Sequence, residues 1–449
     1  MSFPRYPAYK DSGVEWLGEV PEHWEEKPLK TVTSINDEVL SESVSTDHEM
    51  EYVDISSVSL ANGIERTESV IFGDAPSRAR RIPRDGDVLV STVRTYLKAI
   101  APVVSPPSNL VASTGFAVVR PQRGIHPGYL KYALQEEHFI QQVISRSTGV
   151  SYPAINASDI ARIPLSLPKQ SEQLAIATFL DHETAKIDAL ITEQQHLIEL
   201  LQEKRQAVIS HTVTKGLNPD APLKDSGVEW LGEVPEHWTV MPLRLAARIE
   251  SGHTPSRSHE EYWIEKDCVY PWFTLGDVWQ IRDGKAEYVF ETQEKVSQVG
   301  LDNSAARMLP ANTVILSRTA SVGFSGILGV SMATTQDFVN WVCGPKIAPE
   351  FLLFVFRAMS KEFERLKYGS THNTIYMPDI FSFRVALPSL IEQGEIVSDV
   401  RESLRRLDGS FDDLLSSKEL LKERRSALIS AAVTGQIDVR GLVTEACAA

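Results

Sequence analysis

A fifteen-residue stretch occurs twice in this chain without a single difference. Lys10–Trp24 reads KDSGVEWLGEVPEHW, and Lys224–Trp238 repeats it letter for letter. Chance repetition at this length is negligible, so the chain contains an internal duplication with a period of about half its length. The residues that follow the two copies soon differ, and the next stretches share only scattered positions. A constant frame therefore surrounds two variable inserts.

Length and composition indicate a soluble protein of two or three domains. The chain has 449 residues, of which 42% are apolar and 23% charged. Its N-terminus lacks the basic-then-apolar layout of a signal peptide, and the longest apolar run, Phe351–Phe356, is too short to span a bilayer. Three widely spaced cysteines favour a reducing compartment with neither a disulfide framework nor a cysteine zinc site. We expect a cytoplasmic protein.

The net charge of −15 argues mildly against autonomous binding to nucleic acid. Proteins that bind nucleic acid alone usually present a basic patch. If this chain binds DNA, another subunit is expected to supply much of the positive charge.

Each insert predicts a mixed α/β domain. Short apolar runs broken by Gly and Pro predict strands between Pro28 and Arg120, and the spacing of apolar residues predicts a helix over Pro127–Ser145. The second insert, from Pro242 to Leu387, is again rich in strand patterns and then helical near Phe351–Phe363.

A long amphipathic helix is predicted after each insert. The first covers Glu172–Thr212, which contains neither Gly nor Pro; polar Gln194 interrupts its heptads, and Lys215-Gly-Leu-Asn-Pro ends it. The second lies in the same phase, 220 residues later. The heptad residues are Leu180, Ile187, Leu201 and Val208, with Leu190 and Leu197 on the adjoining position, and Val400, Leu407, Leu414, Leu421 and Leu428.

Neither helix can bury its apolar stripe alone, so the two stripes are expected to bury each other. An internal two-fold repeat then requires antiparallel helices with one globular domain at each end, and about 32 paired residues give a spacer of about 48 Å. The alternative is two ordinary core helices of unrelated domains. The predicted class is α/β (α+β), with a pseudo-two-fold repeat. Its segments are a first domain at 1–166, a coiled-coil helix at 167–216, a second domain at 217–386, a second coiled-coil helix at 387–436 and a tail at 437–449.

No motif of a catalytic site is present in the sequence. It lacks a phosphate-binding G-x-x-x-x-G-K loop, a G-x-G-x-x-G turn and an H-E-x-x-H or paired Cys/His metal pattern. The Asn/Asp-Pro-Pro-aromatic signature of amino-methyltransferases is also missing. His23 and His237 lie inside the repeated segment, which favours a structural or interface role for both.

Two local features favour recognition of a ligand. Arginines cluster before and after the strand Val88–Val90, and guanidinium groups bind phosphates and guanine edges. The alternative is a solvated loop in which they pair with Asp85 and Asp87. Polar loops also occupy matching places in the two inserts, and small hydroxyl and amide side chains suit base and phosphate contacts, although ordinary turns use them too.

The chain resembles the specificity subunit of type I restriction–modification systems over nearly its whole length. The resemblance is carried by the repeated Gly-Val-Glu-Trp-Leu-Gly-Glu-Val-Pro-Glu-His-Trp and by the Leu-Pro…Glu-Gln that opens each long helix. The second insert adds Ser251–Trp263, then Tyr270-Pro-Trp-Phe-Thr and Leu316–Gly323. The first insert lacks a counterpart of Gly-His-Thr-Pro-Ser-Arg, so contact residues do not transfer between the inserts.

The resemblance implies a non-catalytic subunit with two target-recognition domains. Each domain would read one half of a bipartite, asymmetric target in double-stranded DNA. The subunit would hold two copies of an adenine-N6 methyltransferase that uses S-adenosylmethionine, and restriction and translocation subunits that use ATP and Mg²⁺ would join them. This chain itself would bind no cofactor and no metal. The competing hypothesis is a two-headed coiled-coil scaffold that joins proteins without binding DNA.

Candidate residues fall into two groups. The candidates for DNA contact are Arg78, Arg80, Arg81, Arg84, Ser91, Arg94, Lys98, Ser113, Thr114, Ser151, Thr254, Ser256, Arg257, Ser317, Arg318, Thr334, Thr335, Gln336, Ser370, Thr371 and His372. The framework candidates are the heptad residues above and the packing tryptophans Trp16, Trp24, Trp230 and Trp238. The sequence leaves the DNA target and its spacer undetermined.

Overall fold

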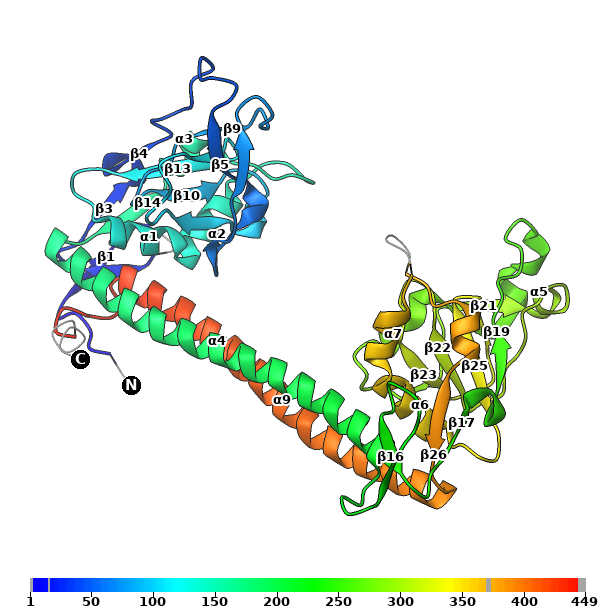
Figure 1. Cartoon of the computed structure of the whole chain (residues 1–449). Coiled ribbons are helices and arrows are strands. Elements are labelled where there is room, and N and C mark those ends of the chain that lie inside the picture. Colours follow the sequence, from blue (N-terminus) through cyan, green and yellow to red (C-terminus); the bar gives the residue numbers. More distant parts are fainter. Residues whose placement is uncertain (1–2, 15–16, 369–372, 443–449) are drawn as a thin grey trace. The chain divides into compact units, whose positions relative to one another are not determined.

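The computed structural model of the protein describes residues 3–14, 17–368 and 373–442. It divides into two compact units, one of residues 1–195 with 416–449 and the other of residues 196–415. Each unit contains one α/β body and parts of both long helices, α4 (Gln170–Lys215) and α9 (Leu390–Val433) (Figure 1). The predicted α/β class with two long helices is therefore confirmed.

The body of the first unit is built mainly from short strands. The strands are β1 (Tyr9–Asp11), β2 (Glu19–Pro21), β3 (Glu25–Pro28), β4 (Thr33–Ile35), β5 (Glu49–Val53), β6 (Val58–Ser59), β7 (Gly63–Ile64), β8 (Glu68–Ile71), β9 (Ala79–Arg81), β10 (Val88–Ser91), β11 (Ile100–Pro102), β12 (Leu110–Ser113), β13 (Phe116–Pro121) and β14 (Pro164–Leu167). The helices are α1 (Pro127–Gln135), α2 (Glu137–Ser145) and α3 (Ala157–Ile160), with 3₁₀ turns η1 (Leu29–Thr31), η2 (Ile55–Ser57) and η3 (Thr95–Leu97).

The body of the second unit begins and ends with the same kinds of element but differs from the first in between, where it adds α5. Its strands are β15 (Leu223–Asp225), β16 (Glu233–Pro235), β17 (Thr239–Pro242), β18 (Ala247–Ser251), β19 (Cys268–Phe273), β20 (Tyr288–Val289), β21 (Glu294–Ser297), β22 (Thr313–Ser317), β23 (Ser325–Leu328), β24 (Ala333–Thr334), β25 (Phe338–Cys343) and β26 (Arg384–Leu387). The helices are α5 (Gln298–Asp302), α6 (Pro349–Ala358), α7 (Ser360–Leu366) and α8 (Met377–Phe381), with 3₁₀ turns η4 (Leu243–Leu245), η5 (Glu260–Tyr262), η6 (Glu265–Asp267) and η7 (Leu275–Gln280).

The sheets of the two units have matching topology. The order β11-β10-β13-β4 in the first unit corresponds to β23-β22-β25-β18 in the second, where β20 extends the sheet. A second sheet has the order β8-β5-β12-β9 in the first unit and β21-β19-β24 in the second, and the pairs β5–β12 and β19–β24 are both parallel. Two inserts with little common sequence therefore have one architecture, because alternating apolar residues specify strands without specifying which residues are used.

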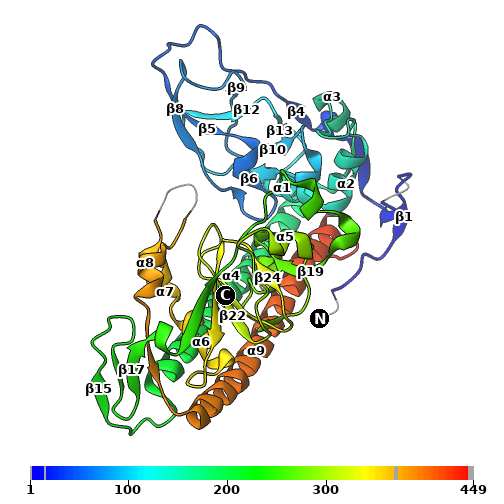
Figure 2. The same ribbon diagram turned by 90° about the vertical axis from the view of Figure 1, so that its right-hand side faces the viewer.

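One helix in each unit packs on the main sheet and closes the core. Helix α1 contacts β10 and β11, and α6 contacts β22 and β23 (Figure 2). The helix predicted over Pro127–Ser145 is divided at Glu136, whose backbone is extended and whose side chain accepts a hydrogen bond from Phe139 N at 3.1 Å. Met359 likewise separates α6 from α7. At Glu136 an acceptor that caps the second helix divides an otherwise continuous apolar pattern, whereas Met359 makes no side-chain cap.

The two long helices run antiparallel. In the first unit Arg425 Nε donates to Asp188 Oδ1 at 2.8 Å, while Gln194 Nε2 donates to Ser417 Oγ at 2.9 Å, so residue numbers rise along α4 as they fall along α9. Gln194, the polar residue that interrupts the predicted heptads, therefore lies in the contact between the two helices. Helix α4 ends at Lys215, and the following Gly216 has a φ of +75° that permits the terminating turn.

The seam between the helices includes one correction to the predicted heptads. Leu190 and Leu197 are exposed, and the second row of seam positions lies one residue later along α4. In a heptad pattern the residues that face the partner helix are separated alternately by three and four residues. Here the second row lies four residues after the first row, not three. The predicted residues Leu180, Ile187, Val400 and Leu428 are buried, and Leu201, Val208, Leu407, Leu414 and Leu421 are partly buried. The second row on α4 is Thr184, Ile191, Ile198, Arg205 and Thr212.

Candidate functional site

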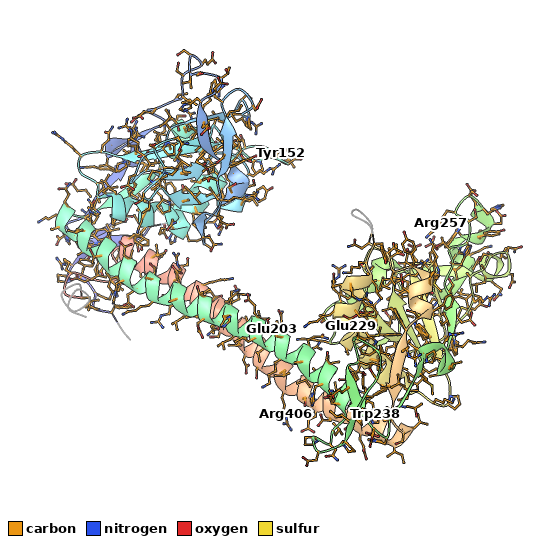
Figure 3. All side chains as sticks on the ribbon, viewed as in Figure 1. Tyr152, Glu203, Glu229, Trp238, Arg257 and Arg406 are labelled. Carbon is orange, nitrogen blue, oxygen red and sulfur yellow. The ribbon has the colours of Figure 1, made fainter. Side chains whose placement is uncertain are left out.

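The duplicated segment anchors each long helix at its first turn. Buried Trp24 donates through Nε1 to Glu172 Oε1 at 3.2 Å, and Trp238 donates to Glu392 Oε1 at 2.9 Å. The histidine before each tryptophan lies within 3.0 Å of the other oxygen of the same glutamate. Figure 3 labels Trp238 in the second unit, near the ends of the two long helices. Both copies therefore make the same contact between the frame and a helix.

A glutamine beside each glutamate fixes the α/β body to the helix. Gln173 accepts from His126 N at 2.7 Å and donates to Gly124 O and Pro168 O. Gln393 makes the equivalent three bonds in the second unit, to Ala348 N, Lys346 O and Pro388 O. Of the remaining framework tryptophans, Trp230 is partly buried against the core, and Trp16 lies outside the described residues.

The three polar loops of the first unit come together in the structure. Thr92 Oγ1 donates to Gly115 O at 2.9 Å, and Arg94 N donates to Pro153 O at 2.8 Å. The guanidinium of Arg94 stacks over the ring of Tyr152 at 4.7 Å, and Figure 3 shows Tyr152 on a loop that extends from the body. Residues from the ends of β10 and β12 and from the loop before α3 thus form one surface, which we call the first loop surface.

The second unit brings its corresponding loops together. Thr254 Oγ1 donates to Gln336 Oε1 at 2.6 Å, and Arg318 Nε donates to Gln336 O at 3.1 Å. The backbone of Ile375 donates to Arg318 O at 2.9 Å, which joins the third loop. We call this the second loop surface. The predicted Ser370, Thr371 and His372 lie outside the described residues.

Several predicted hydroxyl residues are buried and support the loops from below. Ser91 Oγ donates to Val93 O at 2.6 Å, and Ser113 Oγ accepts from Gly115 N at 3.2 Å. Side chains buried in this way cannot reach a ligand unless the loops move, so their positions differ from those expected of contact residues. The buried set is Ser91, Ser113, Ser317, Thr334 and Thr335. The hydroxyl and amide candidates that are not buried are Thr114, Ser151, Thr254, Ser256 and Gln336.

The arginines clustered near β9 interact with different partners. The guanidinium of Arg84 forms an ion pair with Glu38 at 2.6 Å, while its backbone N donates to Asp87 Oδ2 at 2.7 Å. Arg80 stacks over Phe72 at 4.9 Å. Both arginines therefore have partners within the body, and the Arg84 loop contacts Asp87 through its backbone while its side chain pairs with Glu38.

The other basic candidates of the first unit differ in exposure. Arg78 is exposed, and its carbonyl accepts from Thr114 N at 2.7 Å, which places it beside the first loop surface. Burial without a charged partner lowers the pKa of Arg81, which is half-buried on β9. Lys98 forms an ion pair with Glu137 at 2.9 Å. Arg78 and Arg94 are therefore the basic side chains of this group that lie nearest the converged loops.

Arg257 in the second unit is held by neighbouring side chains. Its guanidinium lies 3.8 Å from the ring centre of Trp263 and 5.2 Å from that of Trp272, and it forms an ion pair with Glu294. Trp272 Nε1 also donates to His253 O at 3.3 Å. The motif that contains Arg257 therefore folds as a clamped loop (Figure 3), and Thr254 at its start contacts the second loop surface.

Sequence reasoning missed the exposed aromatic rings beside both loop surfaces. Tyr152 is 65% exposed, and Tyr96 is exposed in η3. In the second unit the rings of Tyr368 and Tyr376 are exposed, with centres 5.8 Å apart. Aromatic residues next to short polar loops were the available signal. Rings of this kind add stacking or apolar contacts to the hydrogen-bonding groups nearby.

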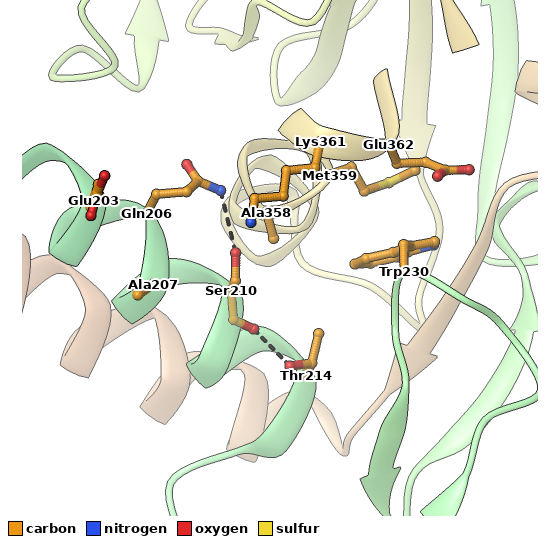
Figure 4. A pocket seen from close by; sticks show the side chains of 10 residues that line it. All are labelled: Glu203, Gln206, Ala207, Ser210, Thr214, Trp230, Ala358, Met359, Lys361 and Glu362. Carbon is orange, nitrogen blue, oxygen red and sulfur yellow. Dashed lines mark hydrogen bonds between the residues drawn. The ribbon is translucent and has the colours of Figure 1, made fainter. Parts of the chain in front are cut away.

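A pocket of about 650 Å³ lies in the second unit where α4 meets the body (Figure 4). Ala207, Trp230 and Met359 supply its apolar lining, and Glu203 and Glu362 lie at its edge. Trp230 belongs to the duplicated segment, so the frame contributes both to the core and to this concave surface.

The structure gives no support for a metal centre or a membrane segment. Within residues 3–14, 17–368 and 373–442, no three His, Cys, Asp or Glu side chains lie close enough to hold a metal ion. None of the helices in these ranges is sufficiently long and apolar to cross a membrane.

Comparison with known proteins gives consistent matches. The family model of the type I restriction modification DNA specificity domain matches twice, at residues 21–200 and 235–404. A candidate type I restriction enzyme specificity subunit of Methanocaldococcus jannaschii, MjaX, is 24% identical over 94% of this chain and 96% of its own length. The HindI specificity subunit of Haemophilus influenzae is 23% identical over 81% of this chain and 89% of its own.

Solved structures share the fold. A chain from a structural study of assembly and conformational transition of a type I R-M system has a TM-score of 0.67 at 21% identity, covering 92% of this chain and 98% of its own. The HsdS subunit of Thermoanaerobacter tengcongensis has a TM-score of 0.50 at 21% identity over 93% and 98% of the two chains.

Proposed function

Because the chain belongs to the family of type I restriction modification DNA specificity domains, we propose that it reads the DNA target of a type I restriction–modification complex. Each unit binds one half of a bipartite, asymmetric target through its loop surface. The observation that carries the proposal is the pairing of one framework with two different surfaces. Identical Trp–Glu contacts hold bodies whose exposed loops differ in sequence.

The proposed contacts in the first unit come from the exposed residues of the first loop surface. Arg78, Arg94, Thr114 and Ser151 supply donors and acceptors, and Tyr152 supplies an aromatic face beside Arg94. Guanidinium groups suit guanine edges and phosphates, while hydroxyl groups suit either. Because Arg94 stacks on a ring, less side-chain entropy is lost when it binds.

In the second unit the proposed contacts are mainly hydrogen-bonding. Thr254, Arg318 and Gln336 already contact one another, so their side chains are arranged before DNA arrives. Glutamine can form two hydrogen bonds to an adenine edge, and arginine can do so to guanine. The two surfaces therefore present different groups, as two unlike half-sites require.

The first experiment identifies the target. Methylome sequencing of cells that express this chain with its methyltransferase gives both half-sites and the spacer.

Gel-shift assays with the co-purified complex then use duplexes in which one half-site is altered. Arg94→Ala should weaken binding about tenfold through the first half-site only. Lys186→Ala, an exposed change on α4 beside Glu183, is the matched control. Failure of the complex to bind or methylate any specific DNA would favour the scaffold hypothesis.

Two copies of a methyltransferase subunit are proposed as partners, one for each framework copy. The pocket beside Trp230 offers an apolar concavity with an acidic edge, features that fit a protein side chain with a basic neighbour. Residues 220 positions later on α9 repeat the helix side of this surface, including Ala427 for Ala207. Both alanines are exposed, so a large side chain there would obstruct docking without disturbing a core.

Native mass spectrometry tests this stoichiometry. Ala207→Arg and Ala427→Arg should each remove one methyltransferase copy, and the double variant should remove both. Gln202→Arg, another exposed change on α4, serves as the control. Retention of both copies by the double variant would refute the proposed docking sites.

Chemistry is assigned to the partner subunits in this proposal. The methyltransferase copies bind S-adenosylmethionine and modify adenine N6, while restriction and translocation subunits bind ATP and Mg²⁺. The complex acts in the cytoplasm. The acidic charge of this chain fits a division of labour in which partner subunits supply many of the phosphate contacts.

A further inference from the structure

The segment Asp283–Glu287 connects η7 to β20 in the second unit and lies against both long helices. From α4, Arg205 Nη2 donates to Gly284 O at 2.7 Å. From α9, Arg401 Nη2 donates to Glu287 Oε2 at 2.6 Å. A surface loop of the α/β body is thus bonded to each member of the helix pair.

Further bonds extend the same contact. Lys285 Nζ donates to Asp412 Oδ1 at 3.0 Å on α9. Arg357, at the end of α6, donates to Ala286 O at 2.7 Å, and Gln206 Nε2 on α4 donates to Arg357 O at 2.9 Å. Loop, body helix and long helix therefore form one connected network, in which backbone carbonyls accept bonds from charged side chains.

Arg205 has a double role in this network. Its Nε donates to Asp408 Oδ1 on α9 at 3.3 Å, while Nη2 reaches the loop, so one guanidinium joins α4, α9 and the body. Arg205 and Asp408 are both largely buried, and water therefore screens their interaction only weakly. Lysine, with one compact ammonium group, lacks the planar fork that makes these separate contacts.

Among its described residues, the first unit contains the equivalent ion pair between the two long helices but not the bond to a loop of the body. Arg425 and Asp188, each 220 residues from Arg205 and Asp408 in the sequence, form an ion pair at 2.8 Å. The body of that unit contacts α4 through α1, where Tyr132 donates to Asp181 Oδ1 at 2.7 Å. The long helices therefore contact both bodies at equivalent helix positions, but the part of the body that they contact differs between the two units.

We infer that residues 283–287 are a latch that fixes the second loop surface on the helix pair and so restricts the spacer between half-sites that the complex accepts. This inference depends on the proposed function. We expect helix length to set the coarse separation of two half-sites, whereas the latch limits rotation and sliding of one body on its helix. Arg205 is accordingly a positioning residue that does not touch DNA.

The test measures methylation by the co-purified complex on duplexes whose spacer is the natural one, one base pair shorter or one longer. Arg205→Ala breaks the latch from the helix side. Gly284→Val breaks it from the loop side, because Gly284 has a φ of +67° and a Cβ there would lie 3.1 Å from Arg205 Nη1. Both variants should lower the preference for the natural spacer about tenfold, as expected for loss of a charge-assisted bond.

Arg425→Ala is the matched control, since it breaks the equivalent ion pair without touching the latch, and it should keep the natural preference. Two variants that alter the latch from opposite sides guard against a folding defect in either. If both latch variants lose methylation equally on all spacers, the latch inference is wrong and the proposed function stands. If the wild-type complex shows no specific methylation or binding at all, the proposed function itself fails.

Discussion

Removal of the Gln393 side chain should destabilise the junction between the second body and its helix. Gln393 is fully buried and forms three hydrogen bonds to the backbone. Its Oε1 accepts from Ala348 N at 2.8 Å, and its Nε2 donates to Lys346 O at 2.9 Å and Pro388 O at 3.1 Å. Gln393→Ala leaves all three backbone groups without this partner.

The expected cost follows from those three groups. A buried donor or acceptor that loses its partner costs about 1–3 kcal/mol, with carbonyls toward the lower end because they retain a second lone pair. Taking about 1 kcal/mol for each group gives about 3 kcal/mol for the variant. The residue touches no proposed DNA contact, so the effect should be on the opening of the junction and not on the choice of target.

Hydrogen exchange measured by mass spectrometry resolves the two units within the full chain. Gln393→Ala should lower the free energy of opening of amides in α6 by about 3 kcal/mol. Gln173→Ala should produce the same decrease in α1, because Gln173 makes the equivalent bonds. Gln202→Ala, an exposed change on α4, should alter protection by less than about 0.5 kcal/mol. If Gln393→Ala matches that control, the three bonds are not what holds the junction.

Three further predictions concern other parts of the chain. Gly409→Ala on α9 has open space around its added methyl and should raise the free energy of unfolding by about 0.5–1 kcal/mol in urea titrations; a decrease would contradict that reasoning. Arg257→Lys loses the flat contact with Trp263, so binding to the second half-site should weaken several-fold in gel shifts while an altered first half-site is still discriminated. Burial raises the pKa of the Cys343 thiol to about 12, so at pH 8 it should stay protonated and react with iodoacetamide far more slowly in folded than in urea-unfolded protein; peptide mapping that shows equal rates would refute this.

Sequence patterns predicted most of the architecture because they report burial. The heptads predicted both long helices, and polar Gln194 appears in the seam as expected. The exact seam was harder to predict, since Leu190 and the residue after it compete for the same face and only packing decides between them. The helix break at Glu136 also depended on a side-chain cap that forms on folding, whereas the break at Met359 has no such cap.

The candidate site was only partly predictable, because hydroxyl and guanidinium groups serve both folding and recognition. The sequence singled out the polar loops but not their convergence, which appears only in the contacts of Thr92 and Arg318. The sequence could not separate Ser91, whose hydroxyl is used inside the loop, from Ser151, which is exposed. Nor could it pair Arg84 with Glu38, which is far away in the chain.

The two framework copies make the same contacts around inserts of different length. Trp24 and Glu172 are 148 residues apart, whereas Trp238 and Glu392 are 154 apart, yet both pairs form the Nε1-to-carboxylate bond. Six residues gained or lost inside the insert therefore leave the junction unchanged. A recognition body can vary in sequence and in length as long as its ends return to the tryptophan and the glutamate. The fifteen identical residues are consequently expected to stay constant while the DNA target changes, because the free energy of this junction depends on them and base contacts do not.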